Sequence, residues 1–333
     1  MNRREFIGGV AAAGLVGVGR ASYPNSAAGS KDAEIRAMLL HLGRNLWGES
    51  TAADHLRCQD SIWDECTGLM AAKGFNMVLV DIAEGLVYPS HPELAVKGSW
   101  SVARMRKELD RLRGMGLEPI PKLNFSATHD LWLGEYHRMV STKKYYEVCA
   151  DLIRDVGEIF GTPRMIHIGF DEEDAPNQHI LEYCVMRQGE LWWHDFLWFV
   201  GQAEKRGMRP WIWSDIVWHH EDEFFSRMPK SVIQSQWFYG PSCDREKSKK
   251  VALFEKIDKA GFDQIPCGSN HGNETNIGEL VRFCRKNLSR EHLKGFLMSS
   301  WYALMPDDEK RKSHTRNIRA IELAAEAFAK VEA

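Results

Sequence analysis

Short apolar runs alternate with amphipathic stretches along most of this chain. The apolar runs predict strands at Met38–Leu42, Phe75–Asp81, Leu117–Leu123, Met165–Gly169, Arg209–Trp213, Val232–Phe238, Phe262–Pro266 and Gly295–Ser300. Apolar positions at helical spacing predict helices at Leu56–Lys73, Val102–Arg113, Lys144–Phe160, Gly189–Arg206, Glu221–Arg227, Lys249–Ala260, Gly278–Asn287 and Ser313–Val331. Several of these helices end in a glycine just before the next strand, as a left-handed helix exit favours.

This order of elements predicts the fold class. The strands are apolar on both faces, which is typical of a parallel sheet covered by helices. Strand and helix alternate throughout, so we predict an α/β fold with one (β/α)8 TIM barrel over residues 31–333. An open doubly wound sheet is the alternative. No G-x-G-x-x-G follows any predicted strand, so a dinucleotide site is not indicated and no cofactor is predicted.

The N-terminal residues 1–30 read as a targeting segment and linker. Arg3 and Arg4 precede the mild apolar stretch from Gly8 to Gly19, which is the pattern of a twin-arginine signal. The stretch is too short to span a bilayer stably, and no cysteine lies near the Ser/Ala/Gly-rich residues 21–30 to carry a lipid. We therefore expect export by the twin-arginine machinery to the periplasm or medium, without a stable membrane anchor. The alternative is an N-terminus that merely begins with two arginines.

Composition narrows the possible partners. The net charge is −3 and opposite charges are interspersed, so no basic face indicates nucleic acid as a partner. The seven cysteines form no C-x-x-C pair. We expect mostly buried free thiols, no disulfide framework and no zinc or other metal site.

A barrel places its chemistry at the carboxyl ends of its strands. Polar or aromatic residues stand at each predicted end: Arg44, Asn45, Asp81, Asn124, Asp171, Glu172, Asp215, Trp237, Tyr239, Ser269, Asn270, His271, Trp301 and Tyr302. Carboxylates and amides bind hydroxyl groups, and aromatic faces stack on the apolar face of a pyranose. A glycan is therefore the predicted substrate.

The most informative of these ends is the adjacent pair Asp171 and Glu172, which follows a short apolar run. Neighbouring carboxylates repel each other, so one is expected to keep its proton while the other stays ionised. Cleavage of a glycosidic bond needs this arrangement. The alternative is a solvated acidic turn before the next helix.

The segment His167-Ile-Gly169-Phe170-Asp171-Glu172 resembles the strand-four motif of glycoside hydrolase family 20, the β-N-acetylhexosaminidases, with Phe170 in place of a second glycine. Other segments resemble the family's strands in order: Leu39–Arg44, Met70–Val78, Gly116–Asn124 with His129, Arg209–Asp215, Val232–Trp237 and Gly295–Trp301. The resemblance implies that Glu172 is the general acid and that Asp171 orients a 2-acetamido group. In that family the acetamide oxygen itself attacks the anomeric carbon, which gives net retention.

The resemblance also implies roles around the acid pair. Arg44 looks like the family's sugar-binding arginine, and Asp81, Asn124 and His129 occupy positions for substrate contacts. His167 looks like a residue bonded to a carboxylate, with a core histidine as the alternative.

Trp237 and Trp301 are predicted walls of the sugar site, with core packing as the alternative. Asp215 is predicted to bind sugar or support Glu172, unless it only ends a turn. The aromatic helix Leu191–Phe199 is predicted to pack on the barrel wall. The pair His219 and His220 reads as a solvated loop, because adjacent residues seldom bind one metal together.

Two segments depart from the family pattern and leave the substrate open. The loop after strand two shrinks to Asp81–Tyr88, and Cys267–Glu274 lacks the family's tyrosine and aspartate at strand seven. The small domain that usually precedes the barrel is also not found. Tyr239 or Asn270 would then contact the acetamide, or the substrate lacks one. The rival hypotheses are a glycosidase with Asp215 or Glu84 as nucleophile, an inactive carbohydrate-binding barrel and, more distantly, a metal-dependent hydrolase.

Overall fold

The computed structural model describes residues 33–43 and 51–330. The described chain forms the strands β1 Ile35–His41, β2 Met77–Asp81, β3 Glu118–Lys122, β4 Met165–His167, β5 Arg209–Trp213, β6 Ile233–Ser235, β7 Cys267–Ser269 and β8 Gly295–Ser299. The α-helices are α1 Asp60–Ala72, α2 Val102–Gly114, α3 Lys143–Ile159, α4 Ala175–Gln178, α5 Glu190–Glu204, α6 Glu221–Arg227, α7 Lys249–Lys259, α8 Asn276–Asn287 and α9 Ser313–Ala329. Short 3-10 helices lie at η1 Ala83–Gly85, η2 Pro92–Leu94, η3 Leu131–Met139 and η4 Asp215–Trp218.

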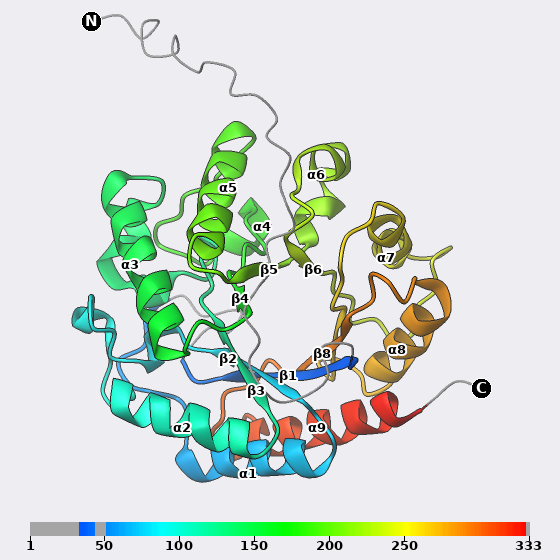
Figure 1. The fold of residues 1–333 in the computed structure, drawn as a ribbon, viewed down its shortest axis with the longest axis horizontal. Coiled ribbons are helices and arrows are strands. Elements are labelled where there is room, and N and C mark those ends of the chain that lie inside the picture. Colours follow the sequence, from blue (N-terminus) through cyan, green and yellow to red (C-terminus); the bar gives the residue numbers. More distant parts are fainter. Residues whose placement is uncertain (1–32, 44–50, 331–333) are drawn as a thin grey trace, which may run out of the picture.

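The strands form one parallel sheet in the order β6-β5-β4-β3-β2-β1-β8-β7. The two end strands meet through single backbone hydrogen bonds: the N–H of Cys267 donates to the carbonyl of Gln236 at 3.1 Å, and the N–H of Ile265 to that of Gln234 at 2.9 Å. Helices surround this ring, and α9 packs between α1 and α8 (Figure 1). The predicted (β/α)8 barrel is confirmed.

The largest difference from the predicted elements is at β7. The prediction placed this strand at Phe262–Pro266, but the regular ladder runs over Cys267–Ser269. Pro266 has no N–H to donate, and residue Gln264 joins its neighbours only through isolated bridges. Helix α4 and the 3-10 helices, which lie in the connections, were not predicted.

Inward and outward side chains alternate along the strands, as in a packed barrel. On β1, Ala37 and Leu39 belong to the cluster inside the ring, whereas Met38 and Leu40 pack outward against the helices. The partly buried rings of Trp237, Tyr239 and Trp301 lie against the inner cluster. The barrel interior is therefore solid below its carboxyl end.

Helix α5 packs its aromatic face inward, as predicted: Trp192, Trp193, Phe196 and Phe199 are buried. All seven cysteines are free, and five of them are buried, which confirms the prediction of mostly buried thiols. Within the described residues, no helix is long and apolar enough to cross a membrane. The predicted export segment lies outside the described residues.

Candidate active site

The uppermost inward layer of the barrel is polar. Strand register places His41, Asp81, Lys122 and His167 beside one another on β1 to β4. All four side chains are at most 2% exposed. The layers below are apolar, so these groups form the floor beneath the strand ends.

Asp81 is the electrostatic centre of this floor. Its Oδ2 accepts a hydrogen bond from Lys122 Nζ at 2.9 Å and lies 3.0 Å from His41 Nδ1. Burial alone would raise the pKa of Asp81, but Lys122 and His41 outweigh it and lower the pKa to about 2. A carboxylate enclosed by these two partners argues against direct contact with a sugar. Lys122 was not predicted; its signal was a lysine at an inward position of an otherwise apolar strand.

His167 is a core histidine, which was the alternative to a residue bonded to a carboxylate. Its side chain is fully buried, and its Nδ1 accepts the N–H of Gly169 at 3.1 Å. Its ring lies 4.5 Å from that of Trp213, and its Nε2 has no hydrogen-bond partner among the described residues. Burial, helped by Lys122, holds the pKa of His167 well below its ordinary value. The expected bond to a carboxylate is not formed, because the imidazole points into the barrel.

The chain leaves β4 in a conformation that few residues adopt. Gly169, Phe170 and Glu172 all have positive φ, at 78°, 69° and 58°. A β-carbon on Gly169 would stand 1.8 Å from Oδ1 of Asn124, so only glycine fits there. Phe170 turns outward, where its ring meets Trp192 at 5.7 Å. The departure from the family motif at this position therefore fills the interface with α5.

The two acids of the pair have different partners. Asp171 accepts a hydrogen bond from Asn124 Nδ2 at 2.9 Å. Glu172 Oε2 lies 3.2 Å from Nε2 of His129, which is also 3.5 Å from Asp171 Oδ2. Side-chain exposure is 18% for Glu172 and 11% for Asp171. Both carboxylates therefore share one histidine and keep limited access to solvent.

The charge on His129 follows from these contacts. Burial alone would lower its pKa, but the charge of Asp171 and the bond to Glu172 raise it to about 9. At neutral pH the imidazole is thus a cation between the two acids.

Asp215 supports the backbone of Glu172. Its Oδ2 accepts the Glu172 N–H at 2.8 Å, and its Oδ1 lies 3.4 Å from the indole nitrogen of Trp237. Burial and, next, the charge of Asp171 raise the pKa of Asp215 to about 8. Asp215 is therefore a third carboxyl group beside the predicted pair, and its raised pKa favours a bound proton at neutral pH.

Aromatic rings line the same end of the barrel. Trp237 and Tyr239 are stacked at 5.0 Å with an interplanar angle of 23°, and Tyr239 lies 6.2 Å from Trp301. All three are partly exposed. Trp218, which the sequence patterns did not point to, packs against Trp237 at 4.3 Å. The rings offer faces on which a pyranose can stack.

Two residues named from the sequence, Asn270 and Glu84, are enclosed, and a third lies outside the described residues. Asn270 is 1% exposed, and its Nδ2 donates to the carbonyl of Arg316 at 2.9 Å, which argues against a contact with the acetamide. Glu84, one of the alternative nucleophiles, is 2% exposed. Arg44 lies outside the described residues.

A metal is the other chemistry that this group of side chains suggests. His129, Asp171 and Glu172 each offer a ligand atom within 4.8 Å of the others, and one histidine with two carboxylates suits a transition metal. A histidine must be neutral to bind a metal. Because the pKa of His129 is raised to about 9, its proton competes with any cation at neutral pH. The contacts fit a hydrogen-bonded ion pair better.

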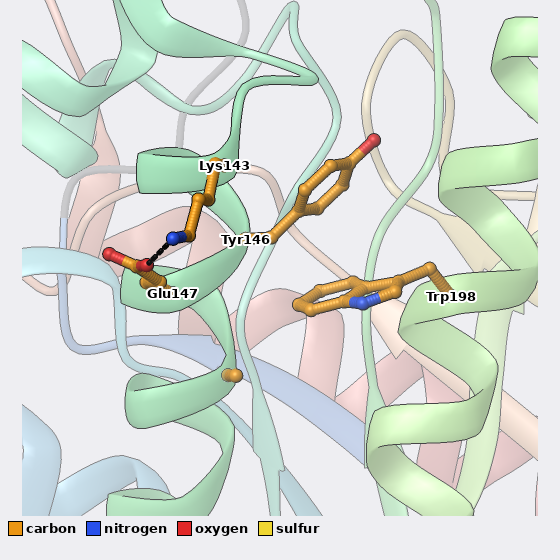
Figure 2. Close-up of a pocket in the computed structure, with 5 residues that line it drawn as sticks. Lys143, Tyr146, Glu147 and Trp198 are labelled. Atoms are coloured by element: carbon orange, nitrogen blue, oxygen red, sulfur yellow. Dashed lines mark ion pairs between the residues drawn. The ribbon is translucent and has the colours of Figure 1, made fainter. Parts of the chain in front are cut away.

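A groove lies away from the acid pair, on the outer wall of the barrel between α3 and α5. Figure 2 shows Lys143, Tyr146, Glu147 and Trp198, which line it together with Ala150. The rings of Tyr146 and Trp198 are 4.7 Å apart, and Lys143 pairs with Glu147 at 3.8 Å. These residues stand on helices and not at strand ends, so the groove is separate from the candidate active site.

The fold and the strand-end residues place the chain in the class of (β/α)8 barrels that carry polar and aromatic groups at the carboxyl end. A β-N-acetylhexosaminidase from Bacteroides fragilis NCTC 9343 superposes with a TM-score of 0.60 at 12% identity, over 87% of this chain and 65% of that chain. A family 20 exo-β-N-acetylglucosaminidase from Vibrio harveyi, in complex with N-acetylglucosamine, gives 0.59 at 12%, over 86% and 54%. A family 20 β-N-acetylhexosaminidase from Streptomyces coelicolor A3(2) gives 0.56 at 14%, over 87% and 64%.

At these identities the likeness establishes the fold. The chain spans less than two thirds of the length of each of the three matched structures. No family model and no curated protein matches the sequence.

Proposed function

We propose that this chain is a glycosidase that removes terminal β-linked N-acetylhexosamine from glycans. The observation that carries the proposal is the pair Asp171 and Glu172 at the end of β4, with one histidine between them and tryptophan rings nearby. The structural likeness to family 20 barrels supports it. No cofactor is needed for this reaction.

Glu172 would donate a proton to the departing glycosidic oxygen. The protonated His129, 3.2 Å away, would supply that proton when the substrate excludes water from the site. Asn124 and His129 would both stabilise a negative charge on Asp171. Its carboxylate would then orient the acetamide whose oxygen attacks the anomeric carbon. The leaving alcohol takes the proton. Water later opens the cyclic intermediate and gives its proton back to the Glu172 carboxylate, with net retention.

The environment of Asp215 disfavours the first rival, in which it attacks the sugar. Both of its oxygens face N–H donors of the protein, and its pKa of about 8 keeps it neutral at pH 7. A neutral acid is a poor nucleophile. We assign Asp215 to holding Glu172 in place.

The test compares 4-nitrophenyl N-acetyl-β-D-glucosaminide with 4-nitrophenyl β-D-glucoside. The proposal predicts hydrolysis of the first and little of the second. Hydrolysis of the glucoside alone would favour the carboxylate nucleophile. If neither is cleaved, Glu172→Gln identifies the inactive barrel: a binding protein keeps its affinity for chitooligosaccharide when this acid is replaced.

We also propose that residues 1–30 direct export by the twin-arginine machinery to the periplasm or medium. The consecutive Arg3 and Arg4 before an apolar stretch support this. Replacing both by lysine should leave the protein in the cytoplasmic fraction of expressing bacteria. Unchanged export of that variant would contradict the proposal.

A further inference from the structure

Two loop segments carry the proposed acid and its histidine partner. Residues 124–129 follow β3 and residues 169–174 follow β4. Side chains of the first segment bind the backbone of the second: Ser126 Oγ donates to the carbonyl of Asp171, and Thr128 Oγ1 to that of Glu172 at 2.6 Å. In return, Glu173 accepts the N–H of Ala127 at 2.8 Å. The two segments therefore hold each other.

A single buried arginine joins both segments from outside the proposed reaction centre. Arg187, in the connection between α4 and α5, has a fully buried side chain. Its guanidinium donates to both carboxylate oxygens of Glu173, with Nε at 3.0 Å from Oε2, and to the carbonyl of Phe125 at 2.7 Å. It also lies 3.4 Å from Asp195 Oδ2 and covers the ring of Phe170 at 4.6 Å.

Charge makes this arginine hard to replace. Burial alone would lower the pKa of Arg187, but Glu173 and its other neighbours outweigh burial and raise it. Burial raises the pKa of nearby Asp130 well above its ordinary value. The guanidinium thus stands between two enclosed carboxylates, Glu173 and Asp195, both at most 4% exposed. Without it, both would be left buried without a counter-charge.

The backbone that Arg187 supports is strained at Glu172. Glu172 directly precedes Glu173 and has a positive φ of 58°, a conformation that persists only when its surroundings fix it. We propose that Arg187 is a positioning residue that, through Glu173 and the Phe125 carbonyl, holds Glu172 at its short distance from His129. This inference rests on the proposed function, in which Glu172 is the acid. The hydrogen bonds and ion pairs of Arg187 go to neither Glu172 nor His129, so its effect on them is indirect.

The matched control lies at the opposite end of β4 from Glu172. Arg164, just before β4, makes a two-pronged bond to Glu118 at 2.8 Å and 2.8 Å. We would compare Arg187→Met, Arg187→Lys and Arg164→Met on phenyl and 2,4-dinitrophenyl N-acetyl-β-D-glucosaminides. The phenyl leaving group needs an acid, whereas 2,4-dinitrophenolate leaves without one. A displaced acid should therefore lower kcat for the phenyl substrate by about 100-fold and for the dinitrophenyl substrate by less than about threefold.

Loss of folded protein lowers both rates equally, so an equal loss on the two substrates overturns the proposal. Arg164→Met should keep the wild-type ratio of rates. If Arg187→Met does not fold, Arg187→Lys retains the charge without the two-pronged geometry and should show the same selective loss. A ratio in Arg187→Lys equal to wild type would also contradict the role.

A second readout needs no turnover, so it separates this inference from the proposed function. The ring resonances of His129 report its pKa by NMR, and the contact with Glu172 helps to raise that pKa to about 9. In the Arg187 variants the pKa should fall by at least about one pH unit, because Glu172 moves away. An unchanged pKa overturns the positioning role. If the wild-type protein has no activity but the pKa of His129 still falls when Arg187 is replaced, only the proposed function is overturned.

Discussion

Replacing Gly169 by alanine should damage stability and activity together. Gly169 has a φ of +78°, and a β-carbon there would stand 1.8 Å from the Oδ1 atom and 2.9 Å from the backbone α-carbon of Asn124. The left-handed conformation costs alanine about 1–2 kcal/mol. Because the clash reaches the backbone of Asn124, the segment after β3 must shift, at about 1–3 kcal/mol for overpacking. The displaced amide also loses its bond to Asp171, worth about 1.5–3 kcal/mol for a charged acceptor.

We therefore expect Gly169→Ala to lower the free energy of unfolding by about 4–8 kcal/mol, measured by urea denaturation. Gly161→Ala is the matched control, because Gly161 has a similar φ of +73° and a methyl group added there would meet no atom within 4 Å. The control should lose only about 1 kcal/mol and keep full kcat. Equal losses in the two variants, with unchanged kcat in Gly169→Ala, would refute the close approach to Asn124.

Three further outcomes are expected. From about pH 6.5 to 8 the folded protein holds protons on His129 and Asp215 that the unfolded chain has released, so the free energy of unfolding falls as pH rises, by about 1.4 kcal/mol per pH unit for each proton. Urea unfolding at pH 6.5 and 8 should show a shallower fall in Asp215→Asn than in the wild type. An identical fall would refute the raised pKa of Asp215. A chelator should leave the rate of hydrolysis unchanged. A loss of activity that added zinc restores would instead mean that His129, Asp171 and Glu172 bind a metal. Trp237→Ala should raise KM about tenfold by removing a stacking face, whereas Trp237→Phe should raise it less; equal KM values in all three proteins would place the sugar elsewhere.

The fold could be predicted because burial on both faces leaves a strong pattern. Seven of the predicted strands overlap the observed ones, and the helices agree to within a few residues at most of their ends. The exception is β7, where Pro266 interrupts the ladder and the pairing is set by neighbouring strands. Pairing between strands distant in sequence leaves no local trace, so such boundaries cannot be predicted from one segment.

The acid pair could be predicted from the sequence, but the roles of the residues around it could not. Lys122 and Arg187 look like surface residues in the sequence, and only the folded chain shows that each is enclosed beside a carboxylate. The raised pKa of Asp215 likewise depends on burial and on the charge of Asp171, from a different strand. Long-range electrostatics of this kind requires the three-dimensional arrangement.

The central claim is that Asp171 orients an acetamide while Glu172 faces the leaving group. A crystal structure with the thiazoline analogue of N-acetylglucosamine, which mimics the proposed cyclic intermediate, tests it most directly. We predict that the thiazoline nitrogen lies within hydrogen-bond distance of the Asp171 carboxylate, that Glu172 lies beside the anomeric carbon, and that the sugar ring stacks on Trp237 or Trp301. A thiazoline bound away from the end of β4, or one whose nitrogen faces no carboxylate, would contradict it.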